Sequence, residues 1–97
     1  MTTLQAEKWL KDDRVNAPCF AVWDREFRRY DVARMHEYGK TVYHVWWNHS
    51  PDRDPRCQRE KDLDADGIGY WLERFAYAEP DDDTEAQISE FENAEAE

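Results

Sequence analysis

The chain has 97 residues, with 23 acidic side chains against 13 Lys and Arg, and a formal net charge of −10. This length predicts one domain, and five Trp, five Tyr and four Phe exclude a wholly disordered chain. The sequence has no apolar run of the roughly 20 residues that would predict a membrane-spanning helix. Only two cysteines occur and the first residues carry no apolar leader, so we expect a reducing, cytoplasmic location.

The N-terminal half predicts a short helix followed by three strands. The helix is expected over residues 3–13, with a Thr cap at residue 2 or 3 and an end at Asn16-Ala17-Pro18. β-branched and aromatic residues predict strands over 19–23, from 26 to about 32, and over 41–47.

Residues 31–38 fit two interpretations. Asp31 is a suitable helix cap and Gly39 a suitable helix stop. The alternative is a longer second strand, which runs to Met35 and turns at Tyr38-Gly39-Lys40 into the third strand. We favour the strand, because the resulting hairpin pairs it with residues 41–47 and completes a three-stranded antiparallel meander.

The C-terminal half predicts a polar loop over 48–61 and then two helices. A helix over 66–78 is expected to begin at an Asp66 cap and to close the core with an apolar stripe of Ile68, Trp71, Leu72 and Phe75. Pro80 is expected to break the chain. A last helix is then predicted from residue 84, with the capping-box spacing of Thr84 and Gln87.

These elements predict an α+β fold: a three- or four-stranded antiparallel sheet with helices packed on it and an acidic C-terminal helix. We expect residues 1–78 to form a compact body and residues 79–97 an acidic segment that is helical from residue 84. Nine of the 23 acids and none of the 13 bases lie in residues 79–97, so the body is nearly neutral. This distribution should repel nucleic acid and anionic membranes and attract basic surfaces.

A calcium-loop pattern, D-x-D-x-D-G-x5-E, spans residues 62–73. Alternate carboxylates in such a loop wrap a hard cation, the glycine permits a sharp turn, and the last Glu binds with both oxygens. The same Asp residues can instead cap the following helix and favour its positive N-terminus. The motif resembles an EF-hand over these twelve residues only. We therefore expect no bound metal. If the loop did bind calcium, the ligands would be Asp62, Asp64, Asp66 and Glu73.

No catalytic constellation occurs in the sequence, which has no nucleophile elbow, P-loop or dinucleotide-binding glycine motif. We therefore expect a protein that is not an enzyme and has no cofactor. Two clusters of bases, at residues 25–34 and 53–61, stand near aromatic residues, as in proteins that bind single-stranded nucleic acid. The acidic total charge favours the other interpretation, in which the protein's own acids partly neutralise a solvated face.

The acidic segment supplies the candidate partner-binding residues: Glu79, Asp81, Asp82, Asp83, Glu85, Glu90, Glu92 and Glu95. A helix over residues 84–97 would span about 21 Å at about 1.5 Å per residue. One DNA strand advances about 3.4 Å per phosphate, so this length matches about six phosphates. A folded row of carboxylates at such density can compete for a Lys/Arg groove that normally binds DNA.

In these features the chain resembles the small DNA-mimic inhibitors encoded by phages and mobile elements, in particular anti-CRISPR proteins acting on type I surveillance complexes. The resemblance lies in size and layout, in the Trp- and Tyr-rich stretch Gly67-Ile68-Gly69-Tyr70-Trp71-Leu72-Glu73, and in the closing helix from Glu85 to Glu97. It implies a non-catalytic inhibitor in the bacterial host cytoplasm. Such an inhibitor would bind the basic groove of the complex and occlude the site that reads the protospacer-adjacent duplex.

Two alternatives to this inhibitor stay open. The first is a calcium-binding module that uses the loop at 62–73. The second is a small regulatory protein whose acidic tail binds a basic partner unrelated to CRISPR. For the inhibitor we expect no direct contact with nucleic acid or with a membrane, since both carry the same sign of charge as the tail.

Overall fold

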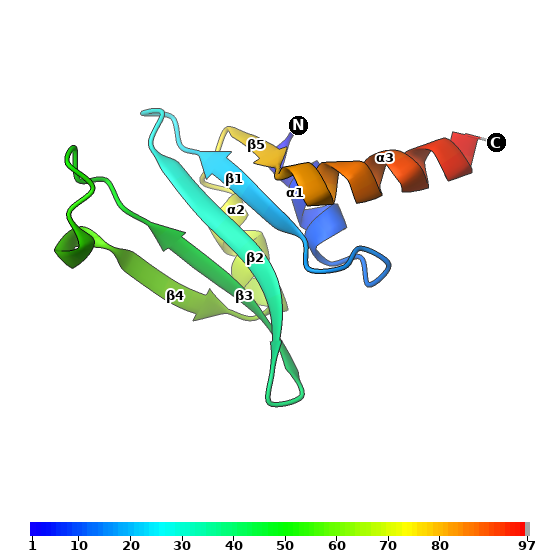
Figure 1. Ribbon diagram of the computed structural model, residues 1–97, viewed down its shortest axis with the longest axis horizontal. Helices are drawn as coiled ribbons and strands as arrows, with labels where there is room; N and C mark the ends of the chain where they lie inside the picture. The colour runs from blue at the N-terminus through cyan, green and yellow to red at the C-terminus, as the bar shows by residue number, and fades with distance from the viewer. Residues whose placement is uncertain (97) are drawn as a thin grey trace.

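The computed structural model describes residues 1–96 and has an α+β fold, as the sequence predicts. Its strands form one antiparallel sheet in the order β4-β3-β2-β1-β5. α1 and α2 lie behind this sheet in Figure 1, and α3 extends from its β5 edge. The strands are β1 (Cys19–Trp23), β2 (Arg29–Glu37), β3 (Lys40–Trp47), β4 (Arg59–Leu63) and β5 (Tyr77–Pro80), and the α-helices are α1 (Thr3–Leu10), α2 (Ala65–Leu72) and α3 (Asp82–Ala96).

Helix α1 begins at a Thr cap, as expected, but ends earlier than residue 13. The Thr2 hydroxyl accepts the Gln5 N–H at 3.1 Å and the Gln5 side chain accepts the Thr2 N–H at 2.9 Å, which forms a capping box. The helix ends at Leu10, because the Asp12 carboxylate accepts the Arg14 N–H at 2.9 Å and turns the chain locally.

The strand interpretation of residues 31–38 is confirmed, and the helical alternative is wrong. β2 runs to Glu37, which pairs with Lys40 at the start of β3. Tyr38 and Gly39 connect the strands with φ angles of 51° and 77°. A two-residue turn with positive φ at both positions has the twist that paired strands need.

The second strand starts at Arg29 rather than at residue 26. The Asp24 carboxylate accepts the N–H groups of Glu26 and Arg28, at 2.9 Å each, and holds the intervening residues as a loop. Phe27 at the tip of this loop has a φ of 62° and is exposed. The turn after β1 is therefore wider than the two residues that the predicted strands leave between them.

The sheet has five strands rather than the expected three or four. β4 begins inside the expected loop at 48–61, and its sequence Arg-Glu-Lys-Asp-Leu has little intrinsic β-propensity. Pairing with β3 forms this strand, and its charges suit an unpaired sheet edge. β5 ends at Pro80, which we expected only as a chain break. Proline is tolerated there because β5 is the other edge strand.

Helix α2 has the expected apolar stripe but different bounds. Its cap is Asp64 rather than Asp66, and the Asp64 carboxylate accepts the Gly67 N–H at 2.7 Å. The helix ends at residue 72 rather than 78, because the chain returns to pair with β1 as β5. Phe75 lies in the loop after the helix and packs, half-buried, against the core. The residues of the stripe within the helix are buried: Ile68, Trp71 and Leu72.

The core lies between the sheet and the two helices behind it. Alternation along the strands directs one set of side chains to this side. The buried members from the strands are Phe20, Val22, Val32, Tyr43, Val45 and Ala78. They meet Ala6, Trp9 and Leu10 of α1 and the stripe of α2. No helix of residues 1–96 is long and apolar enough to cross a membrane.

A buried arginine fastens the loop after α1 to the sheet. Arg34 of β2 is 6% exposed, and its guanidinium donates to the carbonyls of Leu10 (2.9 Å), Asp12 (2.8 Å) and Val15. Leu10 closes the last turn of α1, where carbonyls have no partner within the helix. Arg34 therefore satisfies carbonyls that the core would otherwise isolate from donors. This role was not expected from its place in a cluster of bases.

Candidate partner-binding surface

The eight acids expected to bind a partner are all exposed, along the β5 edge and α3. Glu79 belongs to β5, and Asp81 connects this strand to the helix. The expected acidic segment is thus divided between a strand of the sheet and a helix. The six acids within α3 are Asp82, Asp83, Glu85, Glu90, Glu92 and Glu95.

Helix α3 begins at Asp82 rather than residue 84, and the expected capping box is wrong. The Asp81 carboxylate caps the helix by accepting the Thr84 N–H at 2.8 Å. Thr84 is fully buried, and its hydroxyl accepts the Cys19 N–H at 2.9 Å. Gln87 accepts the Asn16 N–H at 2.7 Å and donates to the Asn16 carbonyl at 2.9 Å. Both residues therefore attach the helix to the body instead of capping it.

Aromatic and aliphatic contacts also fix α3. Ile88 is 4% exposed and belongs to the core. Phe91 stacks on Trp9 of α1 with ring centroids 6.5 Å apart. The Arg14 guanidinium lies 4.9 Å from the Phe91 ring centroid and 3.5 Å from the Glu95 carboxylate. Because the helix is held along its length, its exposed carboxylates keep a defined spacing.

The exposed carboxylates of α3 form two rows. At about 100° per residue, Asp82, Glu85 and Glu92 share one side of the helix, and Asp83 and Glu90 share another. The first row borders a groove of about 450 Å³ between α3 and β5. Two polar residues that line this groove beside the acids, Tyr77 and Ser89, were not predicted from the sequence. Ser89 could have been found, because it lies seven residues after Asp82 and therefore on the same side of the helix.

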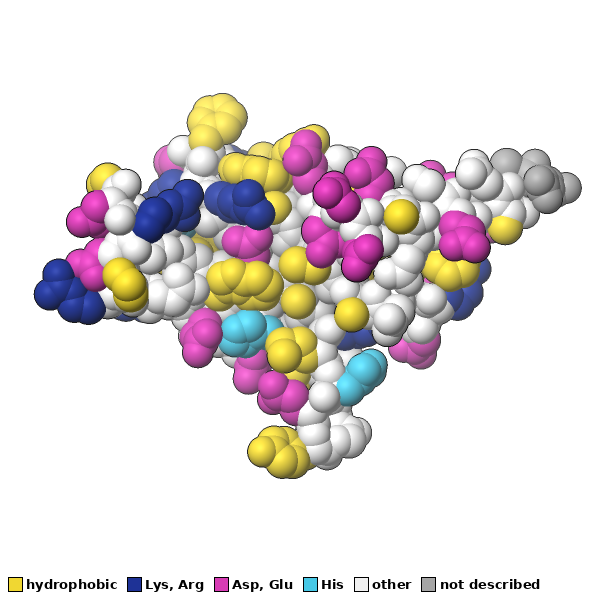
Figure 2. Space-filling view, viewed as in Figure 1, with side chains coloured by type: hydrophobic (Ala, Val, Ile, Leu, Met, Phe, Trp, Pro, Cys, Tyr) yellow, Lys and Arg dark blue, Asp and Glu magenta, His cyan; other side chains and the backbone are white. Residues whose placement is uncertain are grey.

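Ion pairs neutralise much of the body but little of α3. Six acids of the body lie 2.7–3.2 Å from Lys or Arg: Glu7, Asp12, Asp24, Glu26, Asp31 and Asp54. Their partners include Arg28, Arg29 and Arg56 of the two base clusters. Within residues 1–96, Glu95 is the only acid of α3 that forms an ion pair. Figure 2 shows acidic side chains gathered over the start of α3.

The calcium-loop residues are not brought together. Asp62 lies in β4, with a carboxylate oxygen 2.7 Å from Nδ1 of His44, whereas Asp64 caps α2 and Glu73 follows its end. Asp64 and Glu73 are therefore separated by about 13 Å along the helix axis, whereas calcium ligands lie about 2.4 Å from the ion. Within residues 1–96, no three His, Cys, Asp or Glu side chains group as a metal site. Asp64 and Asp66 lie instead at the N-terminus of α2, where their negative charge stabilises the helix.

No protein-family model, curated protein or solved structure matches this chain. The two rows on α3 combine exposure, fixed spacing and carboxylates without ion pairs.

Proposed function

We propose that this chain is a non-catalytic inhibitor that binds the basic nucleic-acid-binding groove of a protein complex by DNA mimicry. The observation that carries this proposal is the set of α3 acids that are exposed and form no ion pair within the described residues 1–96: Asp82, Asp83, Glu85, Glu90 and Glu92. The resemblance to anti-CRISPR proteins makes a type I CRISPR surveillance complex the first partner to test.

The physical basis is that the carboxylates of α3 can take the place of DNA phosphates in a groove lined by Lys and Arg. The 15 residues of α3 rise about 22 Å, which matches about six phosphates of one DNA strand. A Lys/Arg groove that binds DNA gains the same attraction from fixed carboxylates, and long-range attraction speeds the encounter. Occupation of the groove then excludes DNA without any chemical step. Glu79 and Asp81 extend the acidic surface from α3 onto β5.

The same free carboxylates also fit a regulatory protein whose partner is basic but does not bind DNA. DNA competition separates the two functions, because only a groove built for DNA loses its DNA on binding this chain. The calcium-binding alternative is not favoured, since Asp64 and Glu73 lie at opposite ends of α2.

The experiment is a mobility-shift assay with a purified type I surveillance complex and a labelled target duplex. Wild type should displace the duplex, and its affinity for the complex should fall steeply as salt rises. A variant with five substitutions removes charge at constant shape: Asp82→Asn, Asp83→Asn, Glu85→Gln, Glu90→Gln and Glu92→Gln. It should stay folded, because exposed charges contribute little to stability. Its competition should weaken by about tenfold or more.

A matched control carries the same change of net charge on the body: Asp13→Asn, Glu37→Gln, Asp52→Asn, Asp66→Asn and Glu73→Gln. These acids are exposed and, in the described part of the chain, form no ion pair. The control should compete as wild type does. A wild-type protein that leaves the duplex bound would refute the proposal. If both variants lost competition equally, the net charge of the chain, and not the position of the α3 acids, would explain the displacement of DNA.

A further inference from the structure

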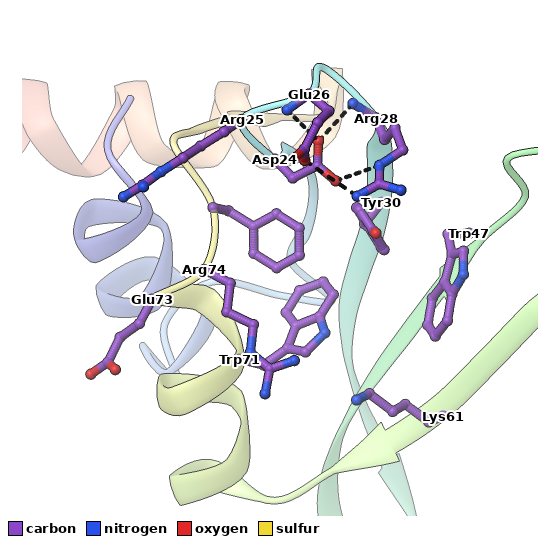
Figure 3. Close-up of a pocket in the computed structure, with 11 residues that line it drawn as sticks. Asp24, Arg25, Glu26, Arg28, Tyr30, Trp47, Lys61, Trp71, Glu73 and Arg74 are labelled. Atoms are coloured by element: carbon purple, nitrogen blue, oxygen red, sulfur yellow. Dashed lines mark hydrogen bonds and ion pairs between the residues drawn. The ribbon is translucent and has the colours of Figure 1, made fainter.

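A cavity lies apart from α3, at one end of the helix-covered face of the sheet. It has a volume of about 600 Å³ and opens between the loop after β1, the strands β2–β4 and the residues that follow α2. Figure 3 shows this cavity with the side chains that line it. The volume falls within the roughly 300–1,000 Å³ that is typical of small-ligand sites.

Aromatic rings form the wall of the cavity around Tyr30. Its ring centroid lies 5.4 Å from that of Trp47, 5.9 Å from that of Trp71 and 4.9 Å from that of Phe75. Tyr30 and Trp47 are both only half-buried, although Trp71 of α2 packs against Tyr30. Burial raises the pKa of the Tyr30 phenol.

Basic side chains without an ion-pair partner among residues 1–96 lie beside these aromatic rings. Arg28 is neutralised by Asp24 at 2.8 Å and by Glu26 at 3.2 Å. Lys61 and Arg74 also line the cavity, and neither forms an ion pair with any residue among 1–96. Figure 3 shows the Lys61 ammonium and the Arg74 guanidinium pointing towards one another across the cavity.

The remaining acid of the lining does not neutralise these cations. The Glu73 carboxylate points away from the aromatic rings in Figure 3. Within residues 1–96, Lys61 and Arg74 thus stay unpaired beside partly exposed aromatic rings, on a chain with a net charge of −10. Together they offer stacking area to a planar ring and charge-assisted hydrogen bonds to an anion.

We propose that this cavity binds a mononucleotide. The base stacks on the Tyr30 and Trp47 rings, and the phosphate accepts hydrogen bonds from Lys61 and Arg74. The site goes beyond the proposed inhibition and shares no residue with it. A single nucleotide fits better than a nucleic-acid strand, because the acidic charge of the chain repels a polyanion but opposes one phosphate only weakly.

Calorimetry on the full chain tests the site with three probes: AMP, adenosine and inorganic phosphate. AMP should bind with a stoichiometry of one and at least about tenfold more tightly than either fragment, because stacking and charge act together. The double variant Lys61→Gln/Arg74→Gln should lose at least about tenfold in AMP affinity and keep its affinity for adenosine. Both side chains are exposed, so this variant should remain folded.

The control Lys8→Gln/Lys40→Gln changes the net charge equally, and its exposed side chains lie outside the cavity. It should bind AMP as wild type does. The α3 variant with five neutral substitutions should also bind AMP undiminished, so failure of DNA competition and failure of nucleotide binding are separate results. The proposal is overturned if AMP gives no saturable heat, or if phosphate alone binds as tightly. Tighter binding of a single-stranded oligonucleotide than of AMP would also overturn it.

Discussion

Replacement of the buried Arg34 tests whether its hydrogen bonds hold the loop after α1. Arg34→Ala leaves the carbonyls of Leu10 and Val15 without their donor in a buried environment. Each unsatisfied buried carbonyl costs about 1–3 kcal/mol, and two therefore cost about 2–6 kcal/mol. The guanidinium no longer has to be desolvated, which offsets part of this cost. We expect a net loss of about 3 kcal/mol in the free energy of unfolding, a large part of the total for so small a domain.

Urea denaturation followed by tryptophan fluorescence measures this loss. With m at about 1–1.5 kcal/mol/M, the midpoint should fall by about 2–3 M. Arg28→Ala is the control, because Arg28 is a half-exposed residue whose pair with Asp24 lies at the surface. Such pairs contribute about 0–1 kcal/mol. Equal midpoints for the two variants would refute the assignment of Arg34 as a structural donor.

Two further predictions concern the core and the thiols. Trp71→Ala should destabilise the fold by about 3–5 kcal/mol, because Trp71 is 6% exposed, whereas Tyr70→Ala on the exposed side of α2 should cost little; equal thermal midpoints would contradict the packing of the helix. Burial raises the pKa of Cys19 to about 11, whereas Cys57 is exposed. A thiol reagent at pH 8 should therefore modify Cys57 at least about tenfold faster, and Cys57→Ser should remove the fast phase; a single rate for both thiols would be the opposite result.

Local sequence determined the elements whose side chains repeat with a clear period. The β-branched and aromatic residues of β1 and β3 identified these strands within one residue of their observed ends. The stripe of Ile68, Trp71 and Leu72 identified the buried side of α2, because these large apolar residues recur at helical spacing. Composition also located the acids of residues 79–95, whose exposure follows from the cost of burying a charge.

Tertiary structure decided the rest, because pairing partners distant in sequence override weak local preference. β4 has a charged sequence that forms a strand only beside β3, and β5 accepts Pro80 because it lies at an edge. Thr84 has the signature of a cap, yet the approach of Cys19 buries its hydroxyl and leaves the cap to Asp81. The cavity around Tyr30 likewise joins residues from three strands, the end of α2 and two loops. No periodicity along the chain predicts that these residues come together, because their proximity depends on where the sheet places each strand.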